Sequence, residues 1–261
     1  MAFSIPSLFL KSVPVGPLTL KVSRDLVFAF AGGEYEEKNV VHWLARIFAT
    51  VGDRATFYDI GANCGYFTLR FSADSKQVYA FEPVQRTYAI LSKNIRKNAL
   101  KNATAFRVGL SEKDGEAVLQ KYSSSGNNSL FRRTLPEGHP LHLIGSEKIP
   151  VARLDSFFVA NALVPPDIMK IDTEGAELFV LKGASNLLAA HKPFICMEFA
   201  ESTYHDAGYS TSDVLAFLQD LKYTVKGLSS EYHEMKLYSI AQFKDTIISN
   251  IIAVPEGMEL R

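Results

Sequence analysis

The chain has 261 residues, of which 47% are hydrophobic and 21% charged, so it can bury a core of its own and form one to two domains. Its 28 lysines and arginines equal its 28 aspartates and glutamates, and a net charge of zero argues against a dedicated nucleic-acid binder. The apolar runs are shorter than the roughly 18 to 20 residues that span a bilayer, and no basic segment precedes the apolar residues of the start, MAFSIPSLFLK. We therefore expect no membrane span and no secretory signal.

The two cysteines carry no sign of a metal site. Cys64 and Cys196 each lie in an apolar segment, and their spacing matches no zinc-binding pattern. We therefore expect two buried thiols. Sparse use of cysteine in a chain large enough to fold without disulfides is typical of a reducing compartment, so the expected location is cytoplasmic.

The start of the chain differs in pattern from the rest. Residues 1–50 are expected to form an N-terminal extension, with short strands around 14–30 followed by a helix that contains Trp43. Residues 51–261 are expected to form one continuous domain, because no internal repeat is visible.

Strands and helices alternate from residue 56 onward. Strands that are apolar on both faces and alternate with helices predict a parallel sheet covered on both sides. The expected fold class is therefore α/β and doubly wound. The predicted elements are strand 56–61, a helix 66–72, strand 77–82, helix 84–98, strand 103–108, strand 166–172, helix 176–182, strand 194–199, helix 212–221 and strand 246–254.

A loop-rich insertion at about 110–153 follows the third of these strands. It contains a serine- and asparagine-rich stretch at 123–129. A long insertion inside a compact domain is functional or mobile. Because open α/β sheets bind ligands at the carboxyl ends of their strands, we expect this segment to form a cap that binds the acceptor.

A glycine-containing turn directly follows the first strand of the domain. It begins with Asp59 and continues Ile-Gly-Ala-Asn-Cys-Gly to Gly65. Gly61 and Gly65 permit a tight turn that brings backbone N–H groups close to a ligand at a helix N-terminus. Glu82 ends the next strand, where an acid accepts hydrogen bonds from both ribose hydroxyls. This combination predicts an adenosine site.

The residues of the turn favour one adenosine cofactor over another. A dinucleotide site requires G-x-G-x-x-G, whereas this chain has G-A-N-C-G, and it contains no Walker A sequence. Asp59 would repel a phosphate but can accept a hydrogen bond from the ammonium group of a methionine moiety. S-adenosylmethionine is therefore favoured, with an NAD oxidoreductase as the alternative.

Several strings in order resemble the signature of the FkbM-type methyltransferases, which are class I S-adenosylmethionine enzymes. They are DIGANCGYFTL, VYAFEP, LSKNIRKNAL, MKIDTEGAELFVLKGA and FICMEF. The resemblance implies a Rossmann-like, mostly parallel sheet of seven strands in the order 3-2-1-4-5-7-6, with the last strand antiparallel.

The resemblance also implies which residues bind the cofactor. Glu82 would hold the ribose, residues 59–65 would wrap the methionine moiety, and residues 109–111 would lie near the adenine. The expected cofactor-binding residues are Tyr35, Glu36, Asp59, Gly61, Ala62, Asn63, Gly65, Phe67, Glu82, Pro83, Gly109, Leu110 and Asp172.

Methyl transfer to an alcohol requires aligned reactants and a base for the hydroxyl proton. Asp172 and Glu174 close the fourth strand, Glu198 ends the fifth, and His205 follows, so these four are the catalytic candidates. Glu174 lies where acids also simply stabilise a helix start, and a lone histidine is often just solvated. Lys170, two residues before Asp172, is expected to form an ion pair with one of the acids.

A divalent cation bound to the acids would be an alternative way to activate a hydroxyl. No histidine or cysteine spacing supports zinc, and we expect no metal. Asn127, Asn128, Ser129 and Tyr204 are candidate acceptor-binding residues, although asparagine and serine also form turns. The basic residues of the insertion, among them Arg132 and Arg133, are expected to form a solvated face.

These observations favour an S-adenosylmethionine-dependent O-methyltransferase. The resemblance and the polar insertion point to a sugar hydroxyl in a glycan, glycolipid or glycosylated natural product. A polyketide-type alcohol and a non-catalytic adenosine-binding scaffold are the alternatives, and the sequence leaves a homodimer open. DNA and aromatic N-methylation are disfavoured, because no [ND]-P-P-[YFW] string follows the fourth strand.

Overall fold

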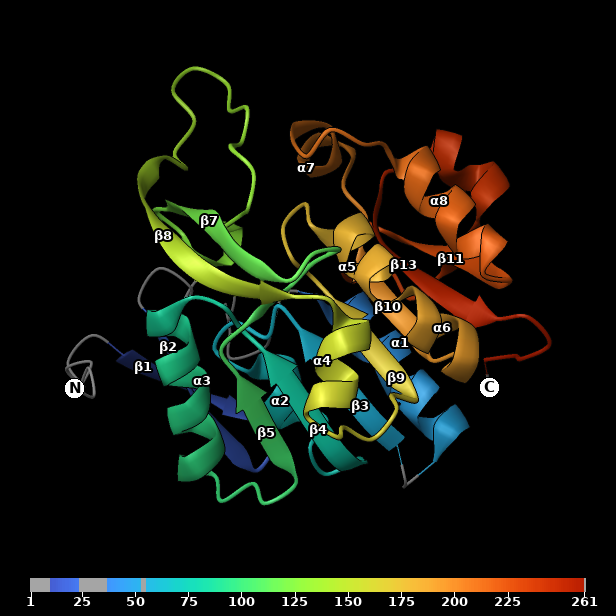
Figure 1. Cartoon of the computed structure of the whole chain (residues 1–261). Coiled ribbons are helices and arrows are strands. Elements are labelled where there is room, and N and C mark those ends of the chain that lie inside the picture. Colours follow the sequence, from blue (N-terminus) through green and yellow to red (C-terminus); the bar gives the residue numbers. More distant parts are fainter. Residues whose placement is uncertain (1–9, 24–36, 53–54, 261) are drawn as a thin grey trace.

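A large mixed sheet runs through the centre of the molecule (Figure 1). The computed structural model describes residues 10–23, 37–52 and 55–260. The sheet has eight strands in the order β12-β11-β13-β10-β9-β3-β4-β5. Their bounds are β3 (Ala55–Ile60), β4 (Ser75–Phe81), β5 (Ala103–Phe106), β9 (Ile168–Ile171), β10 (Phe194–Glu198), β11 (Tyr223–Ser229), β12 (Leu237–Ser239) and β13 (Ile248–Pro255).

The predicted fold class and strand order are confirmed, with one correction. Seven of the strands follow the expected order 3-2-1-4-5-7-6, and β13 is antiparallel to both neighbours, β10 and β11. The eighth strand, β12, was not predicted. It pairs antiparallel with β11 over three residues. A strand this short is too brief to show an apolar alternation, so only the tertiary pairing defines it.

Helices cover both faces of the sheet because strand side chains alternate between the faces. Tyr58 and Ile60 of β3 belong to the apolar cluster of α4, α5, α6 and α8, whereas Phe57 packs with α1 and α2. The bounds are α1 (Lys38–Val51), α2 (Tyr66–Arg70), α3 (Gln85–Lys97), α4 (Leu154–Ala160), α5 (Glu177–Gly183), α6 (Ser185–His191), α7 (Glu201–Asp206) and α8 (Thr211–Asp220).

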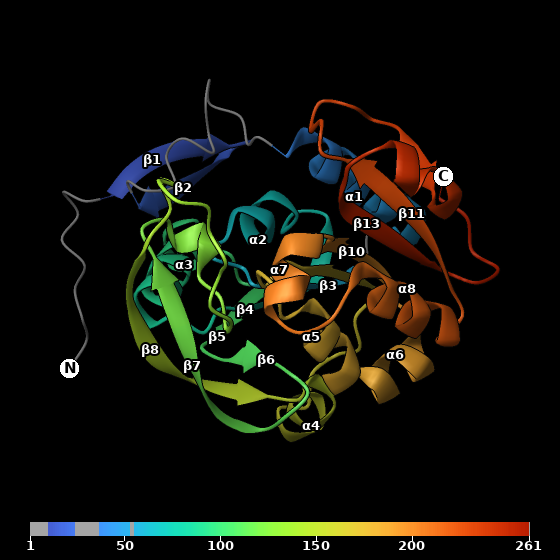
Figure 2. The same ribbon diagram turned by 90° about the horizontal axis from the view of Figure 1, so that it is seen from above.

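The N-terminal residues form a hairpin and then α1. The hairpin consists of β1 (Leu10–Val15) and β2 (Leu18–Ser23), and it packs outside α2 and α3 (Figure 2). The predicted strands around 14–30 are thus found earlier, and residues 24–30 lie outside the described part of the chain. Trp43 lies in α1 as predicted, and Leu44 of that helix packs against the central sheet.

The insertion contains more regular structure than the prediction of a loop-rich segment allowed. It forms a second sheet in the order β6-β8-β7, from β6 (Gly109–Leu110), β7 (Gly115–Tyr122) and β8 (Leu143–Ala152). The predicted third strand ends early, at Phe106, because the chain leaves the central sheet there and β6 pairs with β8. A short 3-10 turn, η3 (Ser125–Asn127), follows β7, and a second, η4 (Ile240–Asp245), precedes β13.

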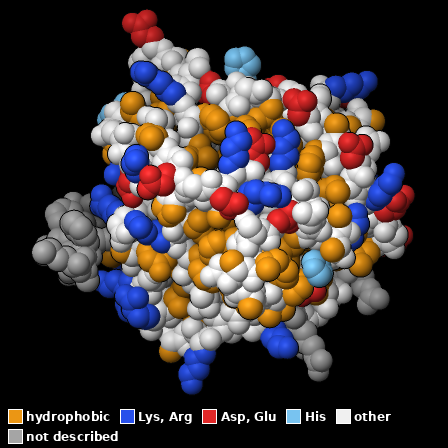
Figure 3. All heavy atoms as spheres, viewed as in Figure 1, with side chains coloured by type: hydrophobic (Ala, Val, Ile, Leu, Met, Phe, Trp, Pro, Cys, Tyr) orange, Lys and Arg blue, Asp and Glu red, His pale blue; other side chains and the backbone are white. Residues whose placement is uncertain are grey.

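Three further observations concern the surface, the cysteines and the length of the helices. On the face seen in Figure 3, acidic, basic and apolar side chains are intermixed. Cys64 and Cys196 are both buried, as predicted. None of the helices in the described ranges is long and apolar enough to span a bilayer.

Candidate active site

A cavity of about 710 Å³ opens at the carboxyl ends of β3, β4, β9 and β10. Such a volume is typical of a small-molecule site. The insertion forms part of its wall through η3 and the two long strands of the second sheet. The cavity therefore lies at the edge where open α/β sheets bind their ligands.

The glycine turn after β3 forms the floor of one end of the cavity. Gly61 and Gly65 have positive φ angles of 79° and 92°. A Cβ atom on Gly61 would lie 1.7 Å from the carbonyl oxygen of Asp172, so no other residue fits without moving the backbone. Gly61 and Ala62 donate their N–H groups to the Phe81 carbonyl at 3.0 Å, which fixes the turn against β4.

Glu82 is buried beside this turn and is held by the backbone. Its two carboxylate oxygens accept hydrogen bonds from the N–H groups of Asn63 at 3.1 Å and Val84 at 2.8 Å. Burial raises its pKa to about 7, and these two hydrogen bonds limit the rise. A carboxylate oriented in this way retains lone pairs for the hydroxyls of a ribose.

The wall next to Glu82 is apolar and comes mainly from the second sheet. Pro83, Gly109 and Leu110 line it, whereas Ser111, the last residue of the segment predicted near the adenine, does not, and Leu119 and Ile149 of the insertion complete it. Gly109 has little room, since a Cβ atom there would lie 3.2 Å from the side chain of Ile149. The insertion therefore contributes to the expected adenine end of the cavity.

Asp59 lies behind the turn and does not line the cavity. Its side chain is 1% exposed and accepts a hydrogen bond from the Thr68 hydroxyl at 2.5 Å. Burial raises its pKa, while Lys170 opposes the rise. On the alternating strand β3, Asp59 points toward the α2 face, which explains why it fastens α2 rather than facing the ligand space.

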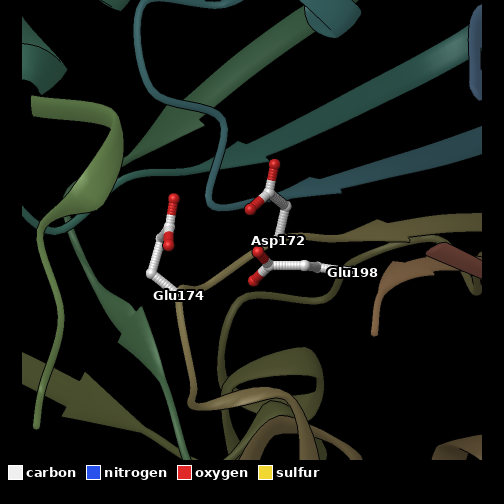
Figure 4. A group of neighbouring side chains, drawn as sticks. All are labelled: Asp172, Glu174 and Glu198. Carbon is white, nitrogen blue, oxygen red and sulfur yellow. The ribbon is translucent and has the colours of Figure 1, made fainter. Parts of the chain in front are cut away.

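Three carboxylates meet in the same cavity, and the backbone of one of them, Asp172, adjoins Gly61 of the glycine turn (Figure 4). One oxygen each of Asp172, Glu174 and Glu198 lies within 4.8 Å of the others. Asp172 and Glu174 follow β9, and Glu198 ends β10, so adjacent parallel strands bring the three together. Carboxylate oxygens at this spacing are able to ligate a divalent cation, and the expected absence of a metal stays a prediction.

Protein cations neutralise two of the three acids. Lys170 Nζ lies 2.6 Å from Asp172 Oδ2, which is the predicted ion pair. Burial alone would lower the pKa of Lys170, but Asp172 and other acids outweigh burial and raise it. The Arg133 guanidinium donates a hydrogen bond to Glu174 Oε2.

The third acid, Glu198, is electrostatically different. Its Oε2 is buried and has no hydrogen-bond partner within the described ranges. Burial, followed by the charges of Glu174, Glu177 and Asp172, raises the pKa of Glu198 well above its usual value. Burial also raises the pKa of Glu174, to about 8, despite the opposing charge of Arg133. The acid cluster therefore holds a proton readily near neutral pH.

The loop that carries Asp172 and Glu174 is fixed from two sides. Glu177 is fully buried, and its carboxylate accepts hydrogen bonds from Thr173 N and Oγ1 and from Gly175 N, at 2.6 to 3.0 Å. From the insertion, the Ser129 hydroxyl donates to the Glu174 carbonyl at 2.6 Å. Glu174 itself has a positive φ of 58°, which such supports help to maintain.

The structure brings most of the predicted site residues to the cavity. Asn127 and Asn128 line it, whereas Ser129 and Tyr204 do not, and His205 is exposed on α7. The Tyr204 hydroxyl instead donates to the Glu198 carbonyl at 2.5 Å, which supports the end of β10. The predicted residues on the cavity wall are Gly61, Ala62, Asn63, Phe67, Glu82, Pro83, Gly109, Leu110, Asn127, Asn128, Asp172, Glu174 and Glu198.

Some predicted residues are not at the cavity, and some cavity residues were not predicted. Gly65 shapes the turn without lining the space, and Tyr35 and Glu36 lie outside the described residues. Arg133 was expected on a solvated face but lies in the cavity wall, paired with Glu174. No local signal separates it from Arg132, because the fold of the insertion determines which of the two points inward.

The residues at the glycine-turn end fit S-adenosylmethionine. Glu82 provides acceptors for the ribose, the backbone approaches closely at Gly61, and an apolar wall stands where the adenine would lie. This site, on a doubly wound sheet with the observed strand order, defines a class I methyltransferase. S-adenosylmethionine supplies an electrophilic methyl group on a sulfonium to such an enzyme.

The family follows from the sequence match. A sequence model of the FkbM methyltransferase domain matches residues 59–225, more than half of the chain, and the chain belongs to this family. S-adenosylmethionine is accordingly its cofactor.

Curated relatives match part of this sequence. Methyltransferase 1 of Beauveria bassiana is 29% identical over an alignment of 147 residues, and the match covers 50% of this chain and 59% of that protein. Hexuronic acid methyltransferase AglP of Haloferax volcanii is 28% identical over 165 residues, which are 63% of this chain and 62% of that protein. The chain thus spans about three fifths of the length of these relatives.

Among solved structures, the FkbM methyltransferase from Methylobacillus flagellatus is similar to this chain. It shows 17% sequence identity and a TM-score of 0.49, and the match covers 77% of this chain and 44% of that one.

Proposed function

We propose that this protein is an S-adenosylmethionine-dependent O-methyltransferase that acts on a sugar hydroxyl in a glycan, glycolipid or glycosylated natural product. The observation that carries the proposal is the meeting of three carboxylates beside the cofactor end of the cavity. Three carboxyl groups in one place offer many hydrogen-bond acceptor atoms, so a substrate with several donors matches them. A polyhydroxylated sugar does so, and one relative is named a hexuronic acid methyltransferase.

The proposed roles follow from the charges of the acids. Asp172 and Glu174 are engaged by Lys170 and Arg133, so they are suited to orient hydroxyls. Glu198 has the unpartnered oxygen, and its raised pKa makes its ionised form a strong base, so we assign ionised Glu198 as the base that accepts the hydroxyl proton at Oε2. Alignment of the acceptor oxygen supplies much of the remaining rate.

The insertion is the proposed acceptor-binding cap. Its polar contributions to the cavity wall are Ser124, Ser125, Asn127, Asn128 and Arg133. We propose that this cap, about residues 110–153, belongs to a methyltransferase domain of 51–261, preceded by an extension of 1–50. The cap would then determine which acceptor binds, and the cofactor end would bind S-adenosylmethionine whichever acceptor is used.

The first experiment tests the cofactor and the second tests the acceptor. Thermal unfolding is measured with S-adenosylmethionine, S-adenosylhomocysteine and NAD, on the wild type and on Glu82→Ala. A ligand at 100 times its Kd stabilises by about 2.7 kcal/mol, so we expect a clear shift with the first two ligands and a loss of the shift in the variant. A shift with NAD alone would overturn the cofactor assignment.

Acceptors are then compared by release of S-adenosylhomocysteine. The panel contains neutral hexosides, hexuronic acid glycosides and polyketide-type secondary alcohols, and NMR locates the methyl group on each product. We expect turnover with the sugars. Turnover with the polyketide alcohols alone would refute the sugar acceptor, and cofactor binding without turnover on any class would favour the non-catalytic scaffold.

A further inference from the structure

The asparagines of the LSKNIRKNAL string hold the N-terminal hairpin against α3. Asn94 accepts a hydrogen bond from Lys21 N and donates to Lys21 O, both at 2.9 Å. Asn98, one turn further on, does the same with Thr19, again at 2.9 Å for both bonds. The two side-chain amides thus pair with alternate residues along the edge of β2, as the backbone of a neighbouring strand would.

Only one of these two asparagines also contacts the glycine turn. Asn94 Nδ2 donates a second hydrogen bond to the Cys64 carbonyl at 2.7 Å. The second donation of Asn98 goes to the Asn94 carbonyl at 2.8 Å, within the same helix. Asn94 is fully buried, and all of its amide hydrogens and its oxygen are engaged.

The turn depends on α3 for its position. A Cβ atom on Gly65 would lie 2.6 Å from the side chain of Leu91, so the turn packs against α3 with no room for a side chain at Gly65. The bond from Asn94 fixes the orientation of the Cys64 carbonyl. The N–H of the same peptide group, Gly65 N, donates to the Ala62 carbonyl at 2.8 Å. The orientation of the peptide groups that face the cofactor is therefore linked to Asn94.

We propose that Asn94 is a positioning residue for the cofactor turn, and that through it the N-terminal hairpin affects cofactor affinity. The bond spans 30 residues, and its loss would leave a buried carbonyl without a donor. The inference concerns cofactor binding and holds whichever acceptor the enzyme uses.

Asn94→Ala and Asn98→Ala form a matched pair. Each loses two bonds to β2, but only Asn94→Ala loses the bond to the turn. We expect both variants to unfold at a lower temperature than wild type. Isothermal titration should show the Kd for S-adenosylhomocysteine raised at least tenfold in Asn94→Ala, or about 1.4 kcal/mol, and within twofold of wild type in Asn98→Ala.

Hydrogen exchange without ligand gives the second readout. We expect faster exchange at residues 18–23 in both variants, and faster exchange at 61–65 in Asn94→Ala alone. If Asn94→Ala does not fold, Asn94→Leu, which fills a similar volume and has no hydrogen-bond donor in its side chain, is measured in its place with the same expectations. Unchanged affinity and exchange at the turn, or equal effects in both members of the pair, would overturn the proposal.

Discussion

The two ends of the cavity differ in the chemical groups that form them. At the cofactor end the backbone predominates, with a turn held by the Phe81 carbonyl and one carboxylate, Glu82, held by two N–H groups. At the proposed acceptor end, titratable side chains predominate, and Lys170 and Arg133 balance part of a three-acid cluster. The first end binds the same cofactor in every reaction. The arrangement of the second end depends on ion pairs between segments that are far apart in the sequence.

The difference predicts that variants at the two ends affect different quantities. A backbone-built site is preorganised, so a change there alters cofactor affinity. In the proposed function, the acid cluster stabilises or accepts charge during the reaction, so we expect a change there to alter turnover. Four measurements either separate the two ends in this way or show that they act as one.

Glu198→Gln should have the largest effect. Replacing the base removes proton acceptance while preserving shape, so we expect kcat to fall about 10²- to 10⁴-fold. The Kd for S-adenosylhomocysteine should stay within twofold of wild type. The kcat is measured with an acceptor found in the panel, and the Kd by titration calorimetry. Glu256→Gln, at an exposed position, is the control. A weakened Kd with normal kcat would assign Glu198 to the cofactor end instead.

Glu82→Gln should act in the opposite way. The ribose loses hydrogen bonds to a charged acceptor, each of which contributes about 1.5 to 3 kcal/mol, so we expect the Kd for S-adenosylhomocysteine to rise about a hundredfold. At saturating cofactor, kcat should change far less. Titration calorimetry measures the first and initial rates the second. An unaltered Kd would remove Glu82 from the cofactor site.

The pH dependence of cofactor affinity should follow Glu82. Because burial raises its pKa to about 7, the free protein protonates this carboxylate as the pH falls from 8 to 6, whereas ribose binding requires the ionised form. The Kd for S-adenosylhomocysteine should therefore be lowest at pH 8 and should rise by up to about tenfold per pH unit below 7. In Glu82→Gln this slope should disappear, and a slope that persists would point to another group.

Removal of metal should have the smallest effect. Lys170 and Arg133 already neutralise two of the three acids, so we expect EDTA to change the turnover rate less than twofold. Loss of activity in EDTA, followed by recovery with Mg²⁺ or Mn²⁺, would contradict this and would make the three carboxylates cation ligands.

Local patterns in the sequence determined the central sheet and the cofactor end. Runs that are apolar on both faces identified β3, β4, β9 and β10, because a strand buried on both sides needs apolar residues throughout. The glycines after β3 and the acid that ends β4 identified the adenosine site, since turn geometry and strand ends are encoded by a few neighbouring residues. The order of the strands came from the family resemblance and was confirmed.

The tertiary structure alone decided the acceptor end. Arg133 and Glu174 are 41 residues apart, and only the second sheet of the insertion brings them together. His205 was an attractive base in the sequence, yet successive helical residues point in different directions, and burial of Tyr204 on α7 leaves His205 exposed. Contacts between distant segments depend on how whole helices and strands pack, so patterns among neighbouring residues in the sequence do not predict these contacts.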